Sequence, residues 1–248
     1  TWTNAAWDGG SEAPLLGSSD AFDLTVASFD NVSFDASGQN VNLGGIHFKP
    51  DGSKMYTPST GTGIINQYTL STAWDVSTAS FDSINKDVNS ENGDPQAVFF
   101  KSDGTKMYHL GEGPDAVFQY TLSTAWDVST ASYDNVSFSL ANEETFPKGL
   151  FFKGDGLKMF IGGSNSDSVH QYTLSTAWDV STASFDNVSF SVAGQEDFSE
   201  GIHFKPDGTK MYMVGRDSDS VYQYALSTAW DLSTASFDNV SFDVSGQD

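Results

Sequence analysis

Apolar and polar positions follow one another along this chain in short runs, and Gly, Ser, Asn and Asp interrupt the runs every few residues. Residues 201–204 form one apolar run, which Pro206-Asp207-Gly208 ends with a hairpin turn signal. Two further runs follow at 210–214 and 221–226, and a fourth lies near 236–244. Short runs bounded by turn residues are typical of β-strands, and no stretch has helical periodicity. The pattern therefore predicts an all-β fold.

The four-strand pattern repeats with a period of 52 residues, the spacing between Lys49 and Lys101. The string Ser-Thr-Ala-Trp-Asp keeps this step. So does the string Lys-x-Asp-Gly-x-Lys-Met-aromatic, which starts at Lys49, Lys101, Lys153 and Lys205. Four short strands in each tandem repeat are typical of a β-propeller blade.

The register of the repeats predicts a single propeller domain over residues 1–248, with a partial blade at 1–40 that lacks the first strand. Four full repeats follow at 41–92, 93–144, 145–196 and 197–248. We therefore expect a five-bladed ring of four-stranded blades with an incomplete first blade, in which residues 1–16 supply the missing strand. Two alternatives remain open: the chain is a fragment of a longer repeat array, or a neighbouring subunit donates the strand.

The sequence of the repeat also resembles that of a known type of repeat. Residues 202–212 read Ile-His-Phe-Lys-Pro-Asp-Gly-Thr-Lys-Met-Tyr, and residues 222–227 read Tyr-Gln-Tyr-Ala-Leu-Ser. This order resembles the YVTN-type β-propeller repeat. With Ser-Thr-Ala-Trp-Asp-Val-Ser-Thr-Ala-Ser added, the repeat looks like those in surface proteins of marine bacteria and virion proteins of their phages. The resemblance covers residues 17–248 and implies an extracellular, cell-surface or virion location. It does not select an activity, because propellers host binding, scaffolding and catalysis.

Charge narrows the range of partners. The chain has 33 acidic and 11 basic side chains, a net charge of −22. Nucleic acids and anionic membrane surfaces attract clustered Lys and Arg, so neither is expected as a partner. Membrane insertion is not expected, since no apolar run approaches the roughly 20 residues of a membrane span. The chain has no cysteine and therefore no disulfide or thiolate metal site.

Common catalytic signatures are missing from the sequence: it contains no Gly-x-Ser-x-Gly, no His-Glu-x-x-His and no P-loop. Among the four histidines, His47 and His203 take the strand position that Phe99 and Phe151 fill in other repeats, which favours a core aromatic role over metal binding. The oxygen donors of residues 87–93 resemble the opening of an EF-hand loop but do not complete it. We therefore expect no catalytic residue, no metal site and no cofactor, with Ca²⁺ as a minor alternative.

A binding site is expected where equivalent loops differ between repeats. One set precedes the first strand of a repeat, and a second lies between its second and third strands, so both belong to one face of a propeller. The variable positions are Gln96, Lys148 and Glu200 in the first set and Glu112, Ser164 and Arg216 in the second. Polar side chains of this kind are suited to a hydroxyl-rich ligand such as a glycan.

These observations favour a non-catalytic binding module that recognises a glycan or a cell-surface receptor. One alternative is a structural propeller that decorates or joins a larger assembly, with other subunits as its partners. A second is a polysaccharide hydrolase or lyase that acts in the central funnel.

Overall fold

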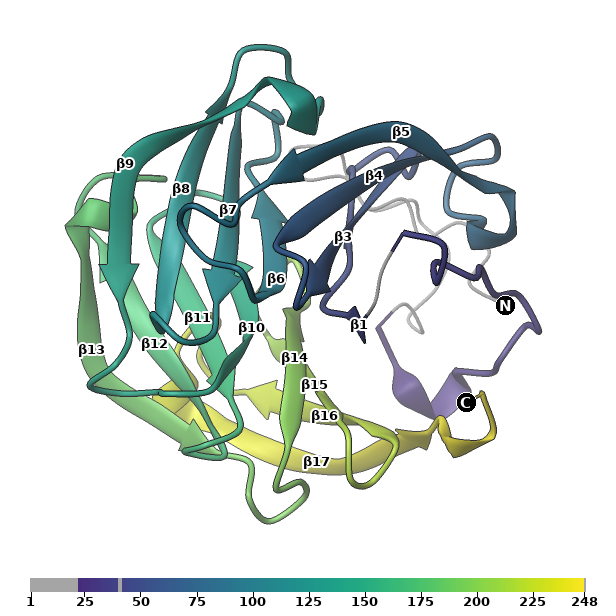
Figure 1. Ribbon diagram of the computed structural model, residues 1–248. Coiled ribbons are helices and arrows are strands. Elements are labelled where there is room, and N and C mark those ends of the chain that lie inside the picture. Colours follow the sequence, from purple (N-terminus) through teal and green to yellow (C-terminus); the bar gives the residue numbers. More distant parts are fainter. Residues whose placement is uncertain (1–21, 40–41, 248) are drawn as a thin grey trace.

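The computed structural model describes residues 22–39 and 42–247. Over these residues the chain forms four antiparallel sheets, set around a common axis (Figure 1). In the sheets of the last three repeats the strands pair in sequence order, in the sheet of the first full repeat the two short first strands both pair with the strand that follows them, and each sheet falls within one 52-residue repeat. Each sheet is one blade, so the prediction of an all-β propeller is confirmed.

The blades have nearly equal elements. Blade 1 contains β1 (Asn42–Leu43), β2 (His47–Phe48), β3 (Lys54–Thr60), β4 (Ile64–Leu70) and β5 (Ala79–Asp87). Blade 2 contains β6 (Pro95–Phe100), β7 (Lys106–Gly111), β8 (Ala116–Leu122) and β9 (Ala131–Ser139). Blade 3 contains β10 (Pro147–Phe152), β11 (Lys158–Gly163), β12 (Ser168–Leu174) and β13 (Ala183–Ser191). Blade 4 contains β14 (Ser199–Phe204), β15 (Lys210–Gly215), β16 (Ser220–Leu226) and β17 (Ala235–Asp243).

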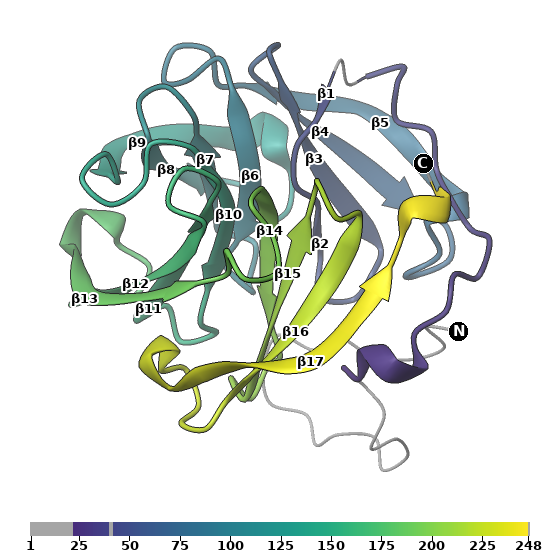
Figure 2. The ribbon, with the colours of Figure 1, turned by 90° about the horizontal axis from the view of Figure 1, so that it is seen from below.

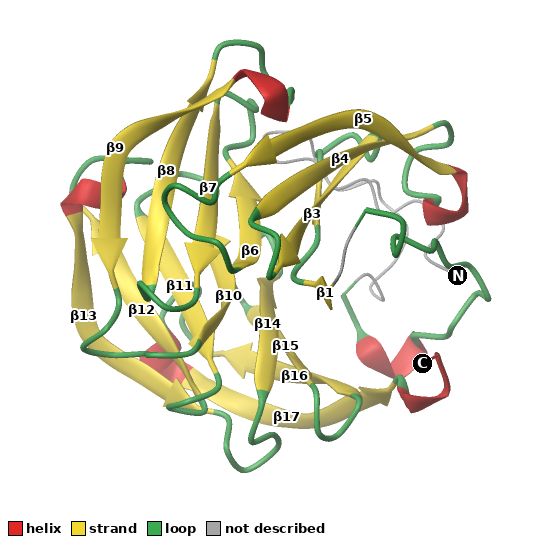
Figure 3. Ribbon diagram, in the orientation of Figure 1, coloured by secondary structure: helices red, strands yellow, loops and turns green. Residues whose placement is uncertain are grey.

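Single 3₁₀ turns join the last two strands of every blade (Figure 3). They are η2 (Val76–Thr78), η3 (Val128–Thr130), η4 (Val180–Thr182) and η5 (Leu232–Thr234), and the further turns η1 (Leu24–Val26) and η6 (Ser245–Gln247) lie outside the sheets. Over residues 22–39 and 42–247, no helix has the length and apolar character that crossing a membrane requires.

The first strand of each blade lies nearest the axis (Figure 2), and β10 contacts both β6 and β14. In blade 1 this strand is split, because β1 pairs with β3 at Asn42 and β2 pairs with it at His47. Gly44 lies in the break. A Cβ atom there would lie 2.6 Å from the carbonyl oxygen of Gln96 in blade 2, so the close approach of the two backbones requires glycine.

Aromatic rings of the repeat join each blade to the next. Tyr56 on β3 is fully buried, and its ring centroid lies 4.4 Å from that of Phe100 in blade 2. The Tyr56 hydroxyl donates a hydrogen bond to the carbonyl of Trp126 at 2.7 Å, which satisfies a buried polar group. Tyr108 makes the equivalent bond to Trp178 of blade 3. The aromatic residue of the repeated string is therefore a contact between blades.

In each repeat, the indole of the tryptophan packs against the backbone of the hairpin glycine. In blade 3, Gly156 has a φ of +72°, and a Cβ atom there would lie 2.4 Å from the Trp178 indole. The backbone N–H of Trp178 also donates to the Gly156 carbonyl at 3.0 Å. Glycine is needed at this turn because the conformation is left-handed and because the indole lies against the backbone.

The prediction of a five-bladed ring with an incomplete first blade is wrong, because the described residues form four blades. Residues 22–39 join no sheet. They contain the equivalent of the 3₁₀ turn of a blade and the segment that corresponds to its last strand. Without a partner strand, this segment cannot form the backbone hydrogen bonds of a sheet. The strand expected from residues 1–16 lies outside the described residues.

Residues 22–39 nevertheless pack against two blades. At one end, the Leu24 N–H donates to Oε1 of Gln223 in blade 4 at 3.3 Å, and the Tyr212 hydroxyl donates to the carbonyl of Phe22. At the other end, Phe34 packs edge-on against Tyr68 of blade 1, with ring centroids 5.4 Å apart. The segment therefore lies between blade 4 and blade 1 (Figures 1 and 2).

Candidate functional site

The six variable loop residues proposed from the sequence as a binding site are called the rim residues. Three of them, Gln96, Glu112 and Lys148, form one cluster between blades 2 and 3. The Lys148 ammonium on β10 lies 2.8 Å from Glu112 Oε2 and 3.1 Å from Gln96 Oε1. The Lys148 and Glu112 side chains are largely buried, with 16% and 22% of their surface exposed. This cation is therefore held inside a contact between two blades.

Two other rim residues form a second pair on blade 4. Arg216 lies 3.6 Å from Glu200 and 3.7 Å from Asp217, and its guanidinium stacks on the Phe198 ring at 4.1 Å. Ser164 belongs to neither group, and its N–H donates to the Phe146 carbonyl at 3.1 Å. The rim thus has its two cations already paired with carboxylates of the protein.

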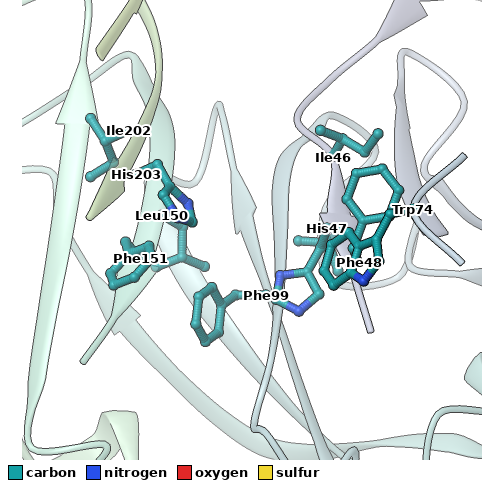
Figure 4. A pocket seen from close by; sticks show the side chains of 10 residues that line it. Ile46, His47, Phe48, Trp74, Phe99, Leu150, Phe151, Ile202 and His203 are labelled. Atoms are coloured by element: carbon teal, nitrogen blue, oxygen red, sulfur yellow. The ribbon is translucent and has the colours of Figure 1, made fainter. Parts of the chain in front are cut away.

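A cavity of about 220 Å³ lies at the axis, lined by the first strands of all four blades together with Trp74 (Figure 4). One layer of its wall consists of four equivalent aliphatic side chains, Ile46, Val98, Leu150 and Ile202. The next layer consists of four equivalent rings, His47, Phe99, Phe151 and His203.

The four rings form an arc in which each packs on the next. Ring centroids lie 5.0 Å apart from His47 to Phe99, 5.5 Å from Phe99 to Phe151 and 5.1 Å from Phe151 to His203. All three contacts are edge-to-face, a favourable geometry for aromatic pairs. Burial lowers the pKa of His47 to about 3, with a further contribution from His203, and lowers the pKa of His203 to about 4. Both imidazoles are therefore uncharged at neutral pH.

A second cluster places a serine beside a buried histidine on blade 3. Ser166 lies in the loop between β11 and β12 and is half-buried, whereas His170 on β12 is only 5% exposed. The Ser166 hydroxyl lies 2.9 Å from His170 Nε2. His170 Nδ1 lies 2.9 Å from the hydroxyl of Ser189, its register partner on β13. The imidazole is thus bonded at both nitrogens and fixed in orientation.

Glu144 positions the serine. This carboxylate is 1% exposed, and its Oε2 accepts from the Ser166 N–H at 3.1 Å and from the Ser166 hydroxyl at 2.6 Å. Its Oε1 accepts from the N–H groups of Phe146 and Asn165 at 2.8 and 3.2 Å. The buried charge is therefore compensated by four donors, and the loop that carries Ser166 is tied to the end of blade 2.

Blade 4 repeats the carboxylate contacts but not the imidazole. Glu196 accepts from the N–H and hydroxyl of Ser218 at 3.0 and 2.5 Å, as Glu144 does from Ser166. The position of His170 is occupied by Tyr222 in blade 4, Phe118 in blade 2 and Asn66 in blade 1. The contact between glutamate and serine is therefore shared by blades 3 and 4, whereas the histidine is specific to blade 3.

His170 belongs to no recognisable sequence motif. Its signal in the sequence is its difference from the equivalent residues of the other repeats, Asn66, Phe118 and Tyr222. Over the described ranges, no group of three or more His, Asp or Glu side chains is arranged to hold a metal ion.

Comparison with known proteins gives similar folds and no family: no protein-family model matches the chain, and no curated protein matches its sequence. Three solved structures are similar over 82% of the chain. They are candidate 6-phosphogluconolactonases from Bacteroides uniformis (12% identity, TM-score 0.55) and Bacteroides fragilis (15%, 0.56), and the periplasmic gluconolactonase of Pseudomonas aeruginosa (15%, 0.51). The chain spans only about half of each, 54–55% of their lengths. At these identities the likeness shows a shared propeller fold.

Two predictions are wrong against this comparison: that the protein is a non-catalytic glycan- or receptor-binding module, and that it is not an enzyme. The similar propellers are described as lactonases, which are enzymes, and none of the three is described as a glycan-binding module. Ser166, His170 and Ser189 form no contiguous sequence motif. Ser166 lies in the loop just before the strand of His170, and strand pairing brings Ser189 to the same imidazole.

Proposed function

We propose that this protein is a hydrolase of carboxylic esters, including cyclic esters, in which Ser166 is the nucleophile and His170 is the general base. The observation that carries the proposal is the 2.9 Å distance from the Ser166 hydroxyl to His170 Nε2, with Nδ1 of the same ring held by Ser189. A nucleophile beside a base that a third group orients is the arrangement that activates serine hydroxyls.

The reaction requires the tautomer in which His170 carries its proton on Nδ1, where the N–H donates a hydrogen bond to the Ser189 hydroxyl. Nε2 then accepts the Ser166 proton while Oγ attacks the ester carbonyl. The bond between the acyl carbon and the alkoxy oxygen of the ester then breaks. The imidazolium gives its proton to the departing alkoxide, which in a lactone stays attached to the acyl chain. Water, deprotonated by the same imidazole, then cleaves the acyl–Ser166 ester.

Glu144 supports this cycle in two ways. It fixes the Ser166 backbone and hydroxyl, so the oxygen stays within reach of the base. Its Oε2 also lies 4.0 Å from His170 Nε2, where a negative charge stabilises the imidazolium formed during attack. The hydroxyl hydrogen points to Glu144 or to His170, and rotation about the Cβ–Oγ bond moves it between them.

The similar structures support the choice of ester chemistry. Gluconolactone and its 6-phosphate are cyclic esters, and the three propellers described above carry those names. Because the likeness is one of fold alone, the support for a nucleophile in this chain comes from the Ser166 geometry.

The proposal includes the location of the protein. The resemblance to YVTN-type repeats of bacterial surface and phage virion proteins supports a location outside the cytoplasm, at a cell surface or on a virion. One similar propeller is described as periplasmic, which is compatible with that setting. No cofactor has a role in the proposed reaction.

Hydrolysis of p-nitrophenyl acetate and of a neutral aldonolactone tests the proposal. Ser166→Ala and His170→Phe should each lower kcat/KM by about 100-fold or more, since general acid–base catalysis contributes about 10²–10⁴-fold. Phe is the residue that blade 2 carries at this position, so folding should be preserved.

Ser218→Ala is the matched control, because Ser218 has the same glutamate contacts and no imidazole beside it. It should retain the activity of the unsubstituted protein. Equal loss in Ser166→Ala and Ser218→Ala, or full activity in a folded Ser166→Ala, would overturn the assignment. So would a purified protein that hydrolyses neither substrate.

A further inference from the structure

The axial cavity has features of a binding site that are independent of Ser166. Its volume of about 220 Å³ exceeds the roughly 150 Å³ of an engineered protein cavity that admits benzene. The space therefore holds one aromatic ring with a substituent, or two small fused rings.

The walls match a flat apolar molecule. Ile46, Leu150 and Ile202 lie next to the arc of four rings (Figure 4). Val98 and the Phe48 and Trp74 rings also line the cavity. Neighbouring rings of the arc are inclined by 64°, 70° and 84°. Such walls present both ring edges and ring faces, the two surfaces that an aromatic guest contacts best.

The hydrogen-bonding side chains of the lining lie at the two ends of the arc. His47 and His203 are the polar side chains that line the cavity, at the positions where blades 2 and 3 have Phe99 and Phe151. Because both imidazoles are uncharged at neutral pH, they can bond to a hydroxyl or an N–H group but cannot neutralise an ion. A charged guest would lose its hydration without compensation.

We propose that the axial cavity binds an uncharged aromatic molecule of one or two rings that carries a single hydroxyl or N–H group, the chemical class of phenols and indoles. The apolar walls hold the rings, and one imidazole bonds to the polar group.

Titration with phenol, toluene and benzoate separates these contributions. Phenol and toluene should both bind and raise the melting temperature, phenol more tightly, and benzoate should not bind. In the double variant His47→Phe/His203→Phe, phenol affinity should fall by about 2- to 10-fold, the worth of one net hydrogen bond, while toluene affinity stays the same. Leu150→Trp, which fills the cavity, should abolish both.

The four histidines give a readout that requires no variant. Phenol should shift the imidazole NMR resonances of His47 and His203, which line the cavity, and leave those of His109 and His170 unchanged. Absence of phenol binding to the unsubstituted protein would overturn the proposal. Binding of benzoate as tight as that of phenol, or equal shifts at all four histidines, would also overturn it. Ser166→Ala should leave phenol binding intact, so this test is independent of the hydrolase test.

Discussion

Ser166 and Ser218 occupy equivalent positions in adjacent blades, and one residue four places further on sets them apart. His170 follows Ser166, whereas Tyr222 follows Ser218. Both serines donate to a buried glutamate, so that contact alone does not create a nucleophile. The imidazole adds a nitrogen that accepts a proton when the ring is neutral, whereas a neutral phenol hydroxyl is a poor proton acceptor.

The pH dependence of hydrolysis tests the base directly. His170 must be neutral to accept the Ser166 proton. Burial lowers its pKa from the ordinary 6.5, and Glu144 opposes part of that shift. We therefore expect kcat/KM to be constant through neutral pH and to fall tenfold per unit along an acid limb whose midpoint lies below 6.5.

A pH–rate profile for Glu144→Gln is the companion measurement. Loss of the carboxylate removes the charge that raises the His170 pKa, so the acid limb should move to still lower pH. A limb at or above pH 6.5 in the unsubstituted protein, or a shift to higher pH in the variant, contradicts the role of His170.

At the scale of the strand and the turn, much of each blade could be predicted from the sequence because one 52-residue pattern recurs with little change. The turn at residues 153–156 and the strand beginning at Lys158 follow from local turn chemistry and apolar runs. Two features could not be predicted from the sequence. Residues 22–39 have the sequence pattern of part of a blade, but a strand needs a partner strand, which the local sequence does not reveal. Ser166 and His170 lie four residues apart, but Ser189 reaches the imidazole only once β12 pairs with β13 in its actual register.

The hairpin turn between β10 and β11 offers a test at this scale, because it contains two glycines with different surroundings. Gly156 has a φ of +72° and lies against the Trp178 indole, whereas a Cβ atom at Gly154 would meet nothing within 4 Å. Gly156→Ala should lower the free energy of unfolding by more than the 1–2 kcal/mol cost of a left-handed alanine, since the indole must also move. Gly154→Ala should change it by less than about 0.5 kcal/mol. Urea denaturation measures both, and equal effects would contradict the pairing of glycine and tryptophan.

At the scale of the whole molecule, two electrostatic effects respond to salt in opposite directions. All eight lysines of the repeated string pair with aspartates at 2.7–3.6 Å, and added salt weakens such pairs. The remaining carboxylates leave a net charge of −22, whose repulsion disfavours the compact state and is relieved by salt.

Distance decides which effect dominates. Raising NaCl from 10 to 150 mM shortens the Debye length from about 30 to about 8 Å. Ion pairs at contact distance lie well inside both lengths and change little, whereas carboxylates on different blades lose most of their mutual repulsion. The melting temperature should therefore rise over this range, most steeply at the low end, because the screening length changes fastest there. Calorimetry in NaCl, with sorbitol at matched osmolality as the control, measures the effect. A flat or falling melting temperature would mean that the paired lysines, rather than the excess carboxylates, dominate the electrostatic free energy of the fold.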